Sequence, residues 1–315
     1  MTARSILVYH PEPGEAQAYA RLIRQPKPPF AVAVCATPAE AEPHIADAEI
    51  LYAWDFPREL LPRAAKLRWA QSMGAGVERL MVPELPRGVT VTRVAGIFGP
   101  WMAEYVLGWC LWLTQRTELF RAQQRERRWR QADPLRLHGA TLCVVGLGDI
   151  GRTIAGAARG FGMRVVGVSQ SGRMVTEAQR VYTARDIRKA MAAADYVALT
   201  VPMTETTRGL IGTAELAAMK PSAWLINVAR GPVVDEAALL DALRGNRLGG
   251  VVLDVFDEEP LPQGHPLWEF GNVVVTPHIS GPSTPDEIAP IFNDNLRRYL
   301  AGRTLRYAVD RKRGY

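Results

Sequence analysis

Apolar residues in the first hundred positions gather in short runs, at Ile6–Tyr9, Ala31–Cys35, Ile50–Trp54 and Leu67–Gln71. Proline and glycine separate these runs from helical or turn-rich segments. Apolar runs of this length, bounded by turn residues, are typical of strands. Because strands that alternate with helices favour a mostly parallel sheet, residues 1–100 predict an α/β domain.

A second series of strands and helices begins at Thr141, after a long helical pattern that starts near Met102. Gly99–Pro100 precedes that pattern and is a candidate hinge and helix start. The later apolar runs are nearly continuous, as expected for parallel strands buried on both faces. They are Thr141–Gly146, Arg164–Ser169, Tyr196–Pro202, Ala223–Ala229, Gly249–Phe256 and Asn272–Pro277.

The last helical segment, Pro285–Leu300, returns to the first domain if the two termini fold together. We therefore expect an α/β protein of two Rossmann-like, doubly wound parallel-sheet domains with a cleft between them. In this prediction residues 1–100 plus 282–315 bind the substrate, and residues 101–281 bind a dinucleotide. A chain of 315 residues is long enough for two such domains.

The chain has a basic balance, with 38 lysines and arginines against 32 acids and a formal net charge of +6. The densest cluster surrounds Trp129, so RNA contact is one interpretation. Arg121, Arg125 and Arg128 recur at helical spacing, which favours a solvated face or a dimer rim instead. Since no recognition motif accompanies the charge, we expect no nucleic-acid partner. The full cluster is Arg121, Arg125, Arg127, Arg128 and Arg130.

Cys35, Cys110 and Cys143 are scattered among apolar residues. This pattern predicts buried free thiols rather than a metal site or a disulfide, and it fits a reducing compartment. The N-terminal segment lacks the apolar region of a signal peptide. The most apolar stretch, Val106–Leu113, is too short to span a bilayer. We therefore expect a cytoplasmic protein with no membrane partner.

A G-x-G-x-x-G pattern follows the strand at Thr141 directly and opens a helix, which is the context of a dinucleotide-binding turn. Its first glycine permits the tight turn, its second lets the backbone approach the pyrophosphate, and its third lets the helix pack on the strand. The helix N-terminus offers amides to the phosphates. An unrelated glycine-rich turn is the alternative. The predicted residues are Gly146, Gly148, Asp149, Ile150 and Gly151.

The end of the next strand carries Ser169, where an NAD enzyme usually places an acid on the ribose hydroxyls. Gln170 follows it, and Arg173 lies four residues beyond Ser169. No carboxylate here would repel a 2′-phosphate, and Arg173 can pair with one. The sequence therefore favours NADP(H), with NAD(H) as the alternative if Arg173 is only a solvated loop residue.

Three later segments each lie at or just after the C-terminal end of a predicted strand, the edge that faces the ligand in a doubly wound sheet. They are Asn227–Leu239, Leu253–Pro262 and Thr276–Gly281. An arginine, an acid and a histidine that meet at this edge suit the reduction of a 2-oxo acid. Arginine can hold a carboxylate, histidine can exchange a proton near neutral pH, and a neighbouring carboxylate can orient the imidazole.

With these motifs, in this order after the glycine-rich turn, the chain resembles the D-isomer-specific 2-hydroxyacid dehydrogenases over nearly its whole length. The resemblance implies that Arg230 binds substrate, that Glu259 supports the histidine, and that His278 donates the proton. It implies that Asp254 lies near the nicotinamide carboxamide. Cofactor contacts are also expected at Val201, Pro202, Val228, Ala229, Arg230, His278 and Gly281.

In the first domain, Ser72–Leu80 resembles the family's glycine-containing substrate loop. The amides of Ala75 and Gly76 would then bind the substrate carboxylate, because consecutive amides form an anion nest. Trp54 follows a strand and, by the resemblance, faces the same region as in related glyoxylate and hydroxypyruvate reductases. It is equally interpretable as a residue that shapes the pocket and as a half-buried core residue. The acid-free turn, Trp101–Tyr105 and the ending Val309–Tyr315 resemble the glyoxylate/hydroxypyruvate reductases most. Small 2-oxo acids are the expected substrates.

Several alternatives remain open. His265 is the competing histidine, which we interpret as structural. A nucleotide-sensing corepressor or a phosphite dehydrogenase could use the same fold, whereas Glu259 argues against a formate dehydrogenase, which carries an amide at that place. The family is commonly a homodimer through its nucleotide domain. The helix Trp101–Leu113 could form that interface or belong to the core.

Overall fold

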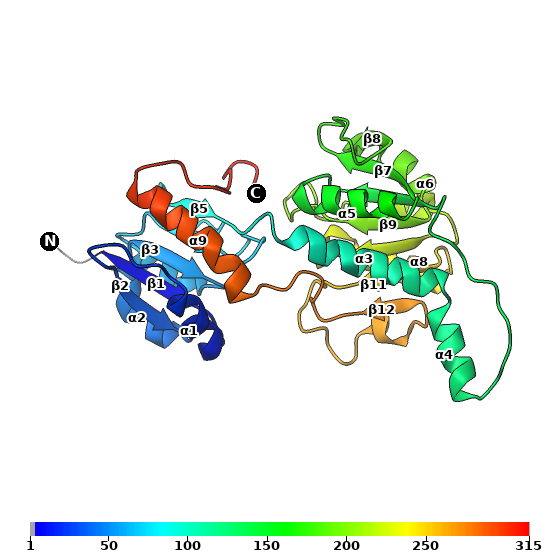
Figure 1. Cartoon of the computed structure of the whole chain (residues 1–315), viewed down its shortest axis with the longest axis horizontal. Coiled ribbons are helices and arrows are strands. Elements are labelled where there is room, and N and C mark those ends of the chain that lie inside the picture. Colours follow the sequence, from blue (N-terminus) through cyan, green and yellow to red (C-terminus); the bar gives the residue numbers. More distant parts are fainter. Residues whose placement is uncertain (1–3, 315) are drawn as a thin grey trace. The chain divides into compact units, whose positions relative to one another are not determined.

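The structure is a computed structural model that describes residues 4–314 of the 315-residue chain. The chain divides into two compact units, Met1–Ile97 with Ser283–Tyr315, and Phe98–Pro282. Each unit is built on its own sheet, and every strand pair in both sheets is parallel (Figure 1). The predicted fold class, two parallel-sheet α/β units, is confirmed.

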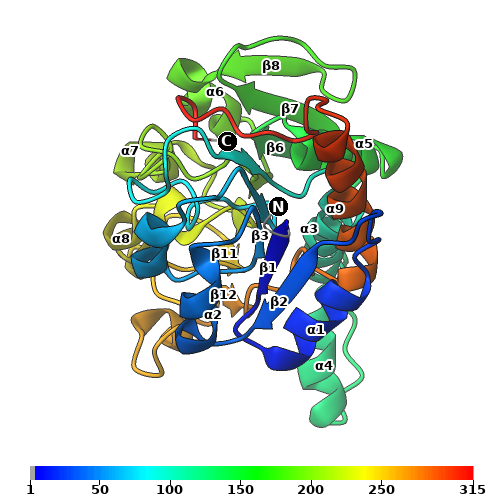
Figure 2. The same cartoon turned by 90° about the vertical axis from the view of Figure 1, so that its left-hand side faces the viewer.

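The sheet of the first unit has five strands in the order β2-β1-β3-β4-β5. Because β1 pairs with both β2 and β3, the crossovers change direction beside β1, and ligands bind outside the strand ends at such a switch point. The strands are β1 (Ser5–Tyr9), β2 (Ala31–Cys35), β3 (Ile50–Ala53), β4 (Trp69–Ser72) and β5 (Thr90–Thr92). The helices α1 (Pro13–Arg21) and α2 (Pro38–Ile45) accompany this sheet (Figure 2).

Helix α9 (Pro285–Leu300) has the predicted bounds and packs on the first unit. The ring of Phe292 stacks on Tyr52 at 4.0 Å and on Trp69 at 5.1 Å between centroids. All three side chains are almost wholly buried. These aromatic contacts fix the C-terminal helix to the strands β3 and β4 of a unit that the chain left at residue 97.

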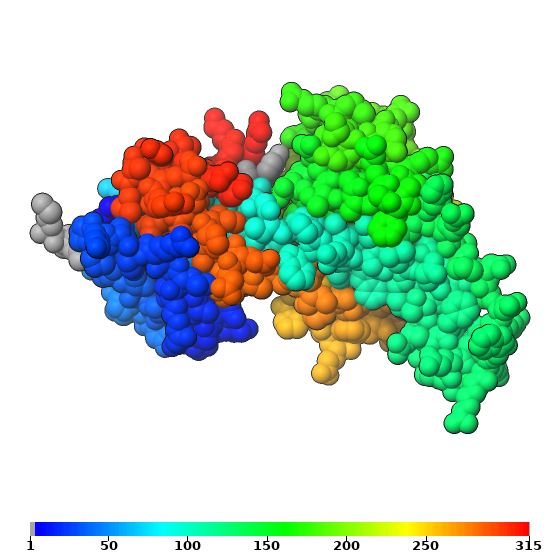
Figure 3. All heavy atoms as spheres, in the orientation of Figure 1, coloured from blue at the N-terminus to red at the C-terminus, as the bar shows by residue number. Residues whose placement is uncertain are grey.

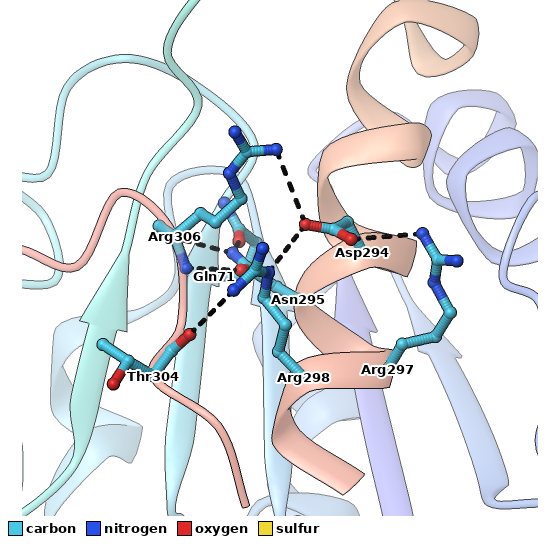
Figure 4. Close-up of polar contacts among 7 residues, drawn as sticks. All are labelled: Gln71, Asp294, Asn295, Arg297, Arg298, Thr304 and Arg306. Atoms are coloured by element: carbon cyan, nitrogen blue, oxygen red, sulfur yellow. Dashed lines mark hydrogen bonds and ion pairs between the residues drawn. The ribbon is translucent and has the colours of Figure 1, made fainter. Parts of the chain in front are cut away.

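A polar network then ties the C-terminal segment to this helix (Figure 4). Asn295 accepts a hydrogen bond from the Arg306 amide at 2.8 Å and donates to Gln71 at 3.2 Å. Asp294 forms ion pairs with Arg298 at 2.9 Å and with Arg297 at 3.1 Å. The segment after α9 is thereby held beside β4, whose last residue opens the predicted substrate loop.

The sheet of the second unit has seven strands in the order β12-β11-β10-β9-β6-β7-β8. Since β6 lies between β7 and β9, the winding reverses there, as in dinucleotide-binding sheets. The strands are β6 (Thr141–Val145), β7 (Arg164–Ser169), β8 (Arg180–Thr183), β9 (Tyr196–Leu199), β10 (Trp224–Asn227), β11 (Gly250–Leu253) and β12 (Val273–Val275). The helices are α3 (Phe98–Thr114), α4 (Thr117–Arg125), α5 (Asp149–Gly160), α6 (Ile187–Ala192), α7 (Thr213–Ala218) and α8 (Glu236–Arg244).

Helix α3 begins at Phe98, one residue before the predicted helix start at Gly99–Pro100 and four residues before Met102, where the helical pattern was expected to begin. Gly99 and Pro100 lie in its first turn, where proline costs no hydrogen bond. A Cβ at Gly99 would lie 2.5 Å from the Thr153 hydroxyl, so glycine lets α3 lie directly against α5. Cys110 is buried in α3, and all three cysteines are buried and free, as predicted.

The basic segment after α3 differs from the prediction. Helix α4 ends at Arg125, and Arg127 has a left-handed φ of 55°, so Arg128 does not share a helical face with Arg121 and Arg125. Trp129 is 97% exposed. Helix α4 and the segment that follows it stand out from the rest of the second unit (Figures 1 and 3). Within residues 4–314, no helix is long and apolar enough to cross a membrane.

Candidate functional site

The glycine-rich turn joins β6 to α5 in the second unit. Gly146 has a φ of 108°, which side chains rarely adopt, and its carbonyl oxygen accepts a hydrogen bond from the Thr200 hydroxyl at 2.7 Å. A Cβ at Gly151 would lie 1.9 Å from that same carbonyl oxygen. Gly146 therefore makes the tight turn possible, and Gly151 allows the first turn of α5 to pack against it.

Gly148 has the opposite surroundings, because no heavy atom would lie within 4 Å of a Cβ placed there. It caps α5, where the first amides of a helix lack partners within the helix. The neighbouring Asp149 and Ile150 form the first residues of α5. Open space beside exposed amides and the positive end of a helix dipole is a suitable setting for a phosphate.

The loop after β7 is the place predicted to choose between NADP(H) and NAD(H). The Ser169 hydroxyl accepts a hydrogen bond from the Gly172 amide at 3.1 Å, and the Ser171 hydroxyl accepts one from the Arg173 amide at 3.3 Å. The side chains of Gln170 and Arg173 are exposed. The start of the loop is thus a closed turn that carries no acid.

Two arginines of α5 hold the far part of the same loop. Arg152 forms an ion pair with Glu177 at 2.9 Å, and Arg159 donates to the Thr176 carbonyl oxygen. The ion pair lowers the pKa of Glu177, chiefly through the hydrogen bond from Arg152. The loop is therefore fastened to the helix that carries the glycine-rich turn.

His278 and Glu259 form a hydrogen-bonded pair, with 2.8 Å between His278 Nδ1 and Glu259 Oε2. The second carboxylate oxygen, Oε1, accepts from the Phe256 amide at 2.9 Å. Partial burial acts to raise the pKa of Glu259, but the hydrogen bonds from His278 and Phe256 and the charges of His278 and Arg230 hold it below its ordinary value. Glu259 is thus suited to stay ionised beside the imidazole.

The backbone at His278 is also unusual. Its φ is 54°, in the left-handed region that few residues with a side chain adopt. Its amide donates to the Asp254 carbonyl oxygen at 2.9 Å. A constrained backbone of this kind at a histidine is typical of functional sites.

Asp254 follows β11 and is fully buried. Its carboxylate accepts hydrogen bonds from the Thr276 hydroxyl at 2.6 Å and from the amides of Ile279 and Ser280, each at 2.8 Å. The sequence singled out Asp254 only for the carboxamide of the cofactor, which stays a prediction. Its contact with the segment that carries His278 was not foreseen.

Arg230 lies in the turn after β10. Asn227 closes this turn, because its side chain donates to the Arg230 carbonyl oxygen at 3.0 Å and accepts from the Ala229 amide at 3.0 Å. The Arg230 side chain is half-buried and donates to the Ala229 carbonyl oxygen at 2.6 Å. Val228 and Ala229 are themselves buried, and their contact with a cofactor stays a prediction.

The remaining candidates of the second unit lie at the same edge of the sheet or in the segments that follow it. Val201 and Pro202 follow β9, and the Pro202 carbonyl oxygen accepts from the Thr207 hydroxyl at 2.7 Å. A Cβ at Gly281 would lie 3.4 Å from both Phe98 and Met102, so Met102 packs beneath the segment of His278. The roles of these residues in cofactor binding stay predictions.

His265 has local partners only. Its Nε2 lies 3.1 Å from Glu236, and its Nδ1 accepts from the Leu267 amide at 3.3 Å, at the start of the 3-10 helix Pro266–Glu269. These contacts agree with the structural role that we expected for it. Within the part of the chain that the structure describes, only His278 combines a carboxylate partner with a left-handed backbone.

In the first unit, the predicted substrate loop follows β4. The Ser72 hydroxyl donates to the Gly76 carbonyl oxygen at 2.8 Å and accepts from the Gly74 amide at 3.1 Å. The amides of Ala75 and Gly76 donate to no acceptor among the described residues. The turn therefore presents two free consecutive N–H groups.

Trp54 is 37% exposed and lies against this turn. A Cβ at Gly74 would be 2.7 Å from Cζ3 of the indole, so only glycine accommodates the ring in this position. The ring centroid of His10, the residue after β1, lies 6.2 Å from that of the indole. Trp54 is thus partly exposed beside the predicted substrate loop, and its role in the pocket stays a prediction.

Comparison with known proteins identifies the family to which the chain belongs. The profile of the D-isomer specific 2-hydroxyacid dehydrogenase NAD binding domain matches residues 107–280. A glyoxylate/hydroxypyruvate reductase A of Photorhabdus laumondii is 31% identical over 276 residues, which cover 85% of this chain and 88% of that protein.

Solved structures agree. A D-isomer specific 2-hydroxyacid dehydrogenase family protein from Aeromonas salmonicida is 37% identical, with a TM-score of 0.89 over 99% of this chain and 100% of its own. An NADPH-dependent glyoxylate/hydroxypyruvate reductase from Sinorhizobium meliloti, in complex with NADP and sulfate, is 27% identical, with a TM-score of 0.91 over 100% of both chains.

A doubly wound sheet with a dinucleotide turn, and with an arginine, a glutamate and a histidine near its strand ends, defines a nicotinamide-dependent oxidoreductase. The chain belongs to the D-isomer specific 2-hydroxyacid dehydrogenase family. Members of this family act on small 2-hydroxy or 2-oxo acids with NAD or NADP, and the expectation of such an enzyme is confirmed.

Proposed function

We propose that the protein reduces small 2-oxo acids of the glyoxylate and hydroxypyruvate type to D-2-hydroxy acids, with His278 as the proton donor and NADPH as the preferred reductant. The observation that carries this proposal is the 2.8 Å hydrogen bond between His278 and Glu259. The similarity to glyoxylate/hydroxypyruvate reductases supports the substrate class.

The residues present fit a nicotinamide dinucleotide. The open space at Gly148 and the N-terminal end of α5 suit its pyrophosphate, and Gly146 and Gly151 shape the turn. When bound, the nucleotide supplies the hydride that reduces the carbonyl carbon of the substrate. The acid-free turn at Ser169, with Arg173 exposed beside it, supports NADPH, because a 2′-phosphate meets hydroxyls and a cation there instead of a carboxylate.

The proton step follows from the geometry of the pair. Since Nδ1 of His278 is engaged by Glu259, Nε2 is the ring nitrogen that can donate to the developing alkoxide. Ionised Glu259 stabilises the protonated imidazole between turnovers. Arg230 binds the substrate carboxylate and offsets negative charge on the reacting oxygen. In the first unit, the consecutive amides of Ala75 and Gly76 suit an anionic group, and Trp54 lies against the same turn.

Absorbance at 340 nm tests the proposal, with purified protein, NADPH or NADH, and glyoxylate, hydroxypyruvate, pyruvate, phenylpyruvate and phosphite. We expect NADPH oxidation with the two small acids. A preference for NADH would overturn the cofactor choice alone. Reduction of NAD or NADP by phosphite, without turnover of any acid, would favour the phosphite dehydrogenase. Absence of any turnover would favour a nucleotide-sensing scaffold.

A variant then tests the proton donor. His278→Ala should lower kcat by about 100- to 10,000-fold, the usual contribution of a general acid, while the affinity for NADPH changes little. His265→Ala is the matched control, since His265 has a carboxylate partner but no proposed role in the reaction. Equal activities of the two variants would remove His278 from the mechanism.

We also propose a cytoplasmic homodimer joined through the second unit. Three buried free cysteines support a reducing compartment. The exposed side chains of Leu119 and Phe120 on the projecting helix α4 support self-association. Sedimentation velocity of the wild type and of Phe120→Asp tests the dimer, because the charge should shift the protein to monomer. A monomeric wild type would contradict it.

A further inference from the structure

The segment Thr276–Gly281, here the His278 loop, is held by one buried carboxylate. Oδ1 of Asp254 accepts from the Thr276 hydroxyl and from the Ile279 amide, and Oδ2 accepts from the Ser280 amide. These three donors lie on both sides of His278. Because a carboxylate at 0% exposure is costly unless hydrogen bonds satisfy it, breaking this arrangement should be strongly unfavourable.

The hydrogen-bonded chain continues to helix α3. The Tyr105 hydroxyl lies 2.5 Å from the Thr276 hydroxyl. A threonine hydroxyl has a single proton, and Thr276 donates it to Asp254, which as a carboxylate can only accept. Tyr105 must therefore be the donor to Thr276. The direction of the chain is fixed as Tyr105 to Thr276 to Asp254.

Helix α3 also contacts the other end of the His278 loop. Phe98 and Met102 lie against Gly281, where a Cβ would meet each of them at 3.4 Å. Phe98, Met102 and Tyr105 are spaced by four and three residues and share one face of the helix. One face of α3 thus contacts both the first and the last residue of the loop. Tyr105 makes the polar contact, and Phe98 and Met102 make the apolar ones.

We propose that Tyr105 and Thr276 are positioning residues for the proton transfer: through Asp254 they fix the His278 loop, and with it the imidazole, against Glu259. This inference rests on the proposed role of His278. Neither side chain is required to touch substrate or cofactor. These hydrogen bonds raise the free energy needed to move the His278 loop. The hydrogen bond between His278 and Glu259 therefore stays formed while the substrate is bound.

Three variants test this chain of hydrogen bonds. Tyr105→Phe removes the donor, Thr276→Val removes the link while keeping the shape, and Thr276→Ser restores the hydroxyl. Tyr196→Phe is the matched control, because Tyr196 is a buried tyrosine of the same unit whose hydroxyl makes no hydrogen bond among the described residues. Hydrogen exchange of the peptide that contains Ile279 and Ser280 reports the loop without relying on catalysis.

With Tyr105→Phe and Thr276→Val we expect the amides of that peptide to exchange at least about fivefold faster, the equilibrium effect of one hydrogen bond. We expect kcat to fall about fivefold, the dissociation constant of NADPH to stay unchanged, and the solvent deuterium isotope effect on kcat to rise, because proton transfer becomes slower. Thr276→Ser and Tyr196→Phe should resemble the wild type in all four measurements.

The proposal is overturned if exchange is unchanged in Tyr105→Phe and Thr276→Val, or if exchange accelerates while kcat and the isotope effect do not move. Additive effects in the double variant would also overturn it, since two members of one chain must be coupled. If His278 is not the proton donor, His278→Ala will keep full turnover. The hydrogen-exchange measurement can still be interpreted in that case, because it does not depend on catalysis.

Discussion

Gly231 and Phe256 lie so close together that a Cβ on Gly231 would be 2.0 Å from the carbonyl carbon of Phe256. Gly231 follows Arg230 directly, and the amide of Phe256 donates to Glu259. The contact therefore joins the segment of Arg230 to the segment of Glu259. Glycine is required here by the space available, since Gly231 is not among the residues with positive φ.

Replacing that glycine should separate the two segments. Gly231→Ala is expected to destabilise the folded protein by about 2 kcal/mol or more, because the added methyl group meets backbone that cannot rotate away. Urea denaturation measures the loss. Gly264→Ala is the control, as no heavy atom would lie within 4 Å of its Cβ. Equal stability of the two variants would contradict the packing argument.

The pair of Glu259 and His278 should give a recognisable pH dependence. The pKa of Glu259 in the folded protein lies below its ordinary value of 4.5. Its charge therefore stabilises the folded state fully above that pH, and the stabilisation is lost as the pH falls through the lower folded value. The difference in urea midpoint between the wild type and Glu259→Gln should shrink across this window. A difference that stays constant down to pH 3 would argue against an ionised Glu259.

Cofactor choice should depend on the turn after β7. Ser169→Asp is expected to shift the ratio of kcat/KM for NADPH over NADH by about 10- to 100-fold toward NADH, since a carboxylate repels the 2′-phosphate and binds ribose hydroxyls. Arg173→Ala should raise KM for NADPH alone. Arg164→Ala, at the opposite end of the same strand, is the control. An unchanged ratio in Ser169→Asp would show that the phosphate is recognised elsewhere.

The contact between Gly74 and Trp54 should govern the affinity for the acid. Gly74→Ala displaces the indole, because the new methyl group would lie 2.7 Å from Cζ3. We expect KM for glyoxylate to rise several-fold, with little change in the dissociation constant of NADPH, whose predicted contacts lie in the second unit. Gly14→Ala in α1 has open space and serves as the control. An unaltered KM would leave Trp54 without a role in the substrate pocket.

Much of the fold was predictable because hydrophobic periodicity encodes it directly. The predicted bounds of β2, β7 and α9 coincide with those observed. In contrast, β9, β10 and β11 end earlier than predicted, at Leu199, Asn227 and Leu253. Apolar residues continue past each strand, as at Val228 and Phe256, because the turns that carry the candidate site residues are themselves packed on the core. Strands β5 and β8 escaped notice because both are short and partly polar.

The candidate site was predictable where a motif carries the chemistry and not where tertiary contacts do. Arg230, Glu259 and His278 stand in recognisable segments. The link from Tyr105 to Thr276 spans 171 residues, and a tyrosine in an apolar helix gives no local sign of a polar partner. The link from Thr276 to Asp254 spans 22 residues and depends on two neighbouring parallel strands, β11 and β12. Such contacts depend on which strands are neighbours in the sheet, and the sequence motifs alone do not reveal that order.

The fastening of the loop after β7 has a practical meaning for biocatalysis. Arg152 and Arg159 of α5 bind Glu177 and Thr176, which follow Arg173 in the loop by four and three residues. Residues 169–173 can therefore be substituted while Glu177 and Thr176 keep their contacts with α5. If residues 169–173 choose the cofactor, as proposed, they can be exchanged as one short segment to match the enzyme to a particular cofactor-recycling scheme.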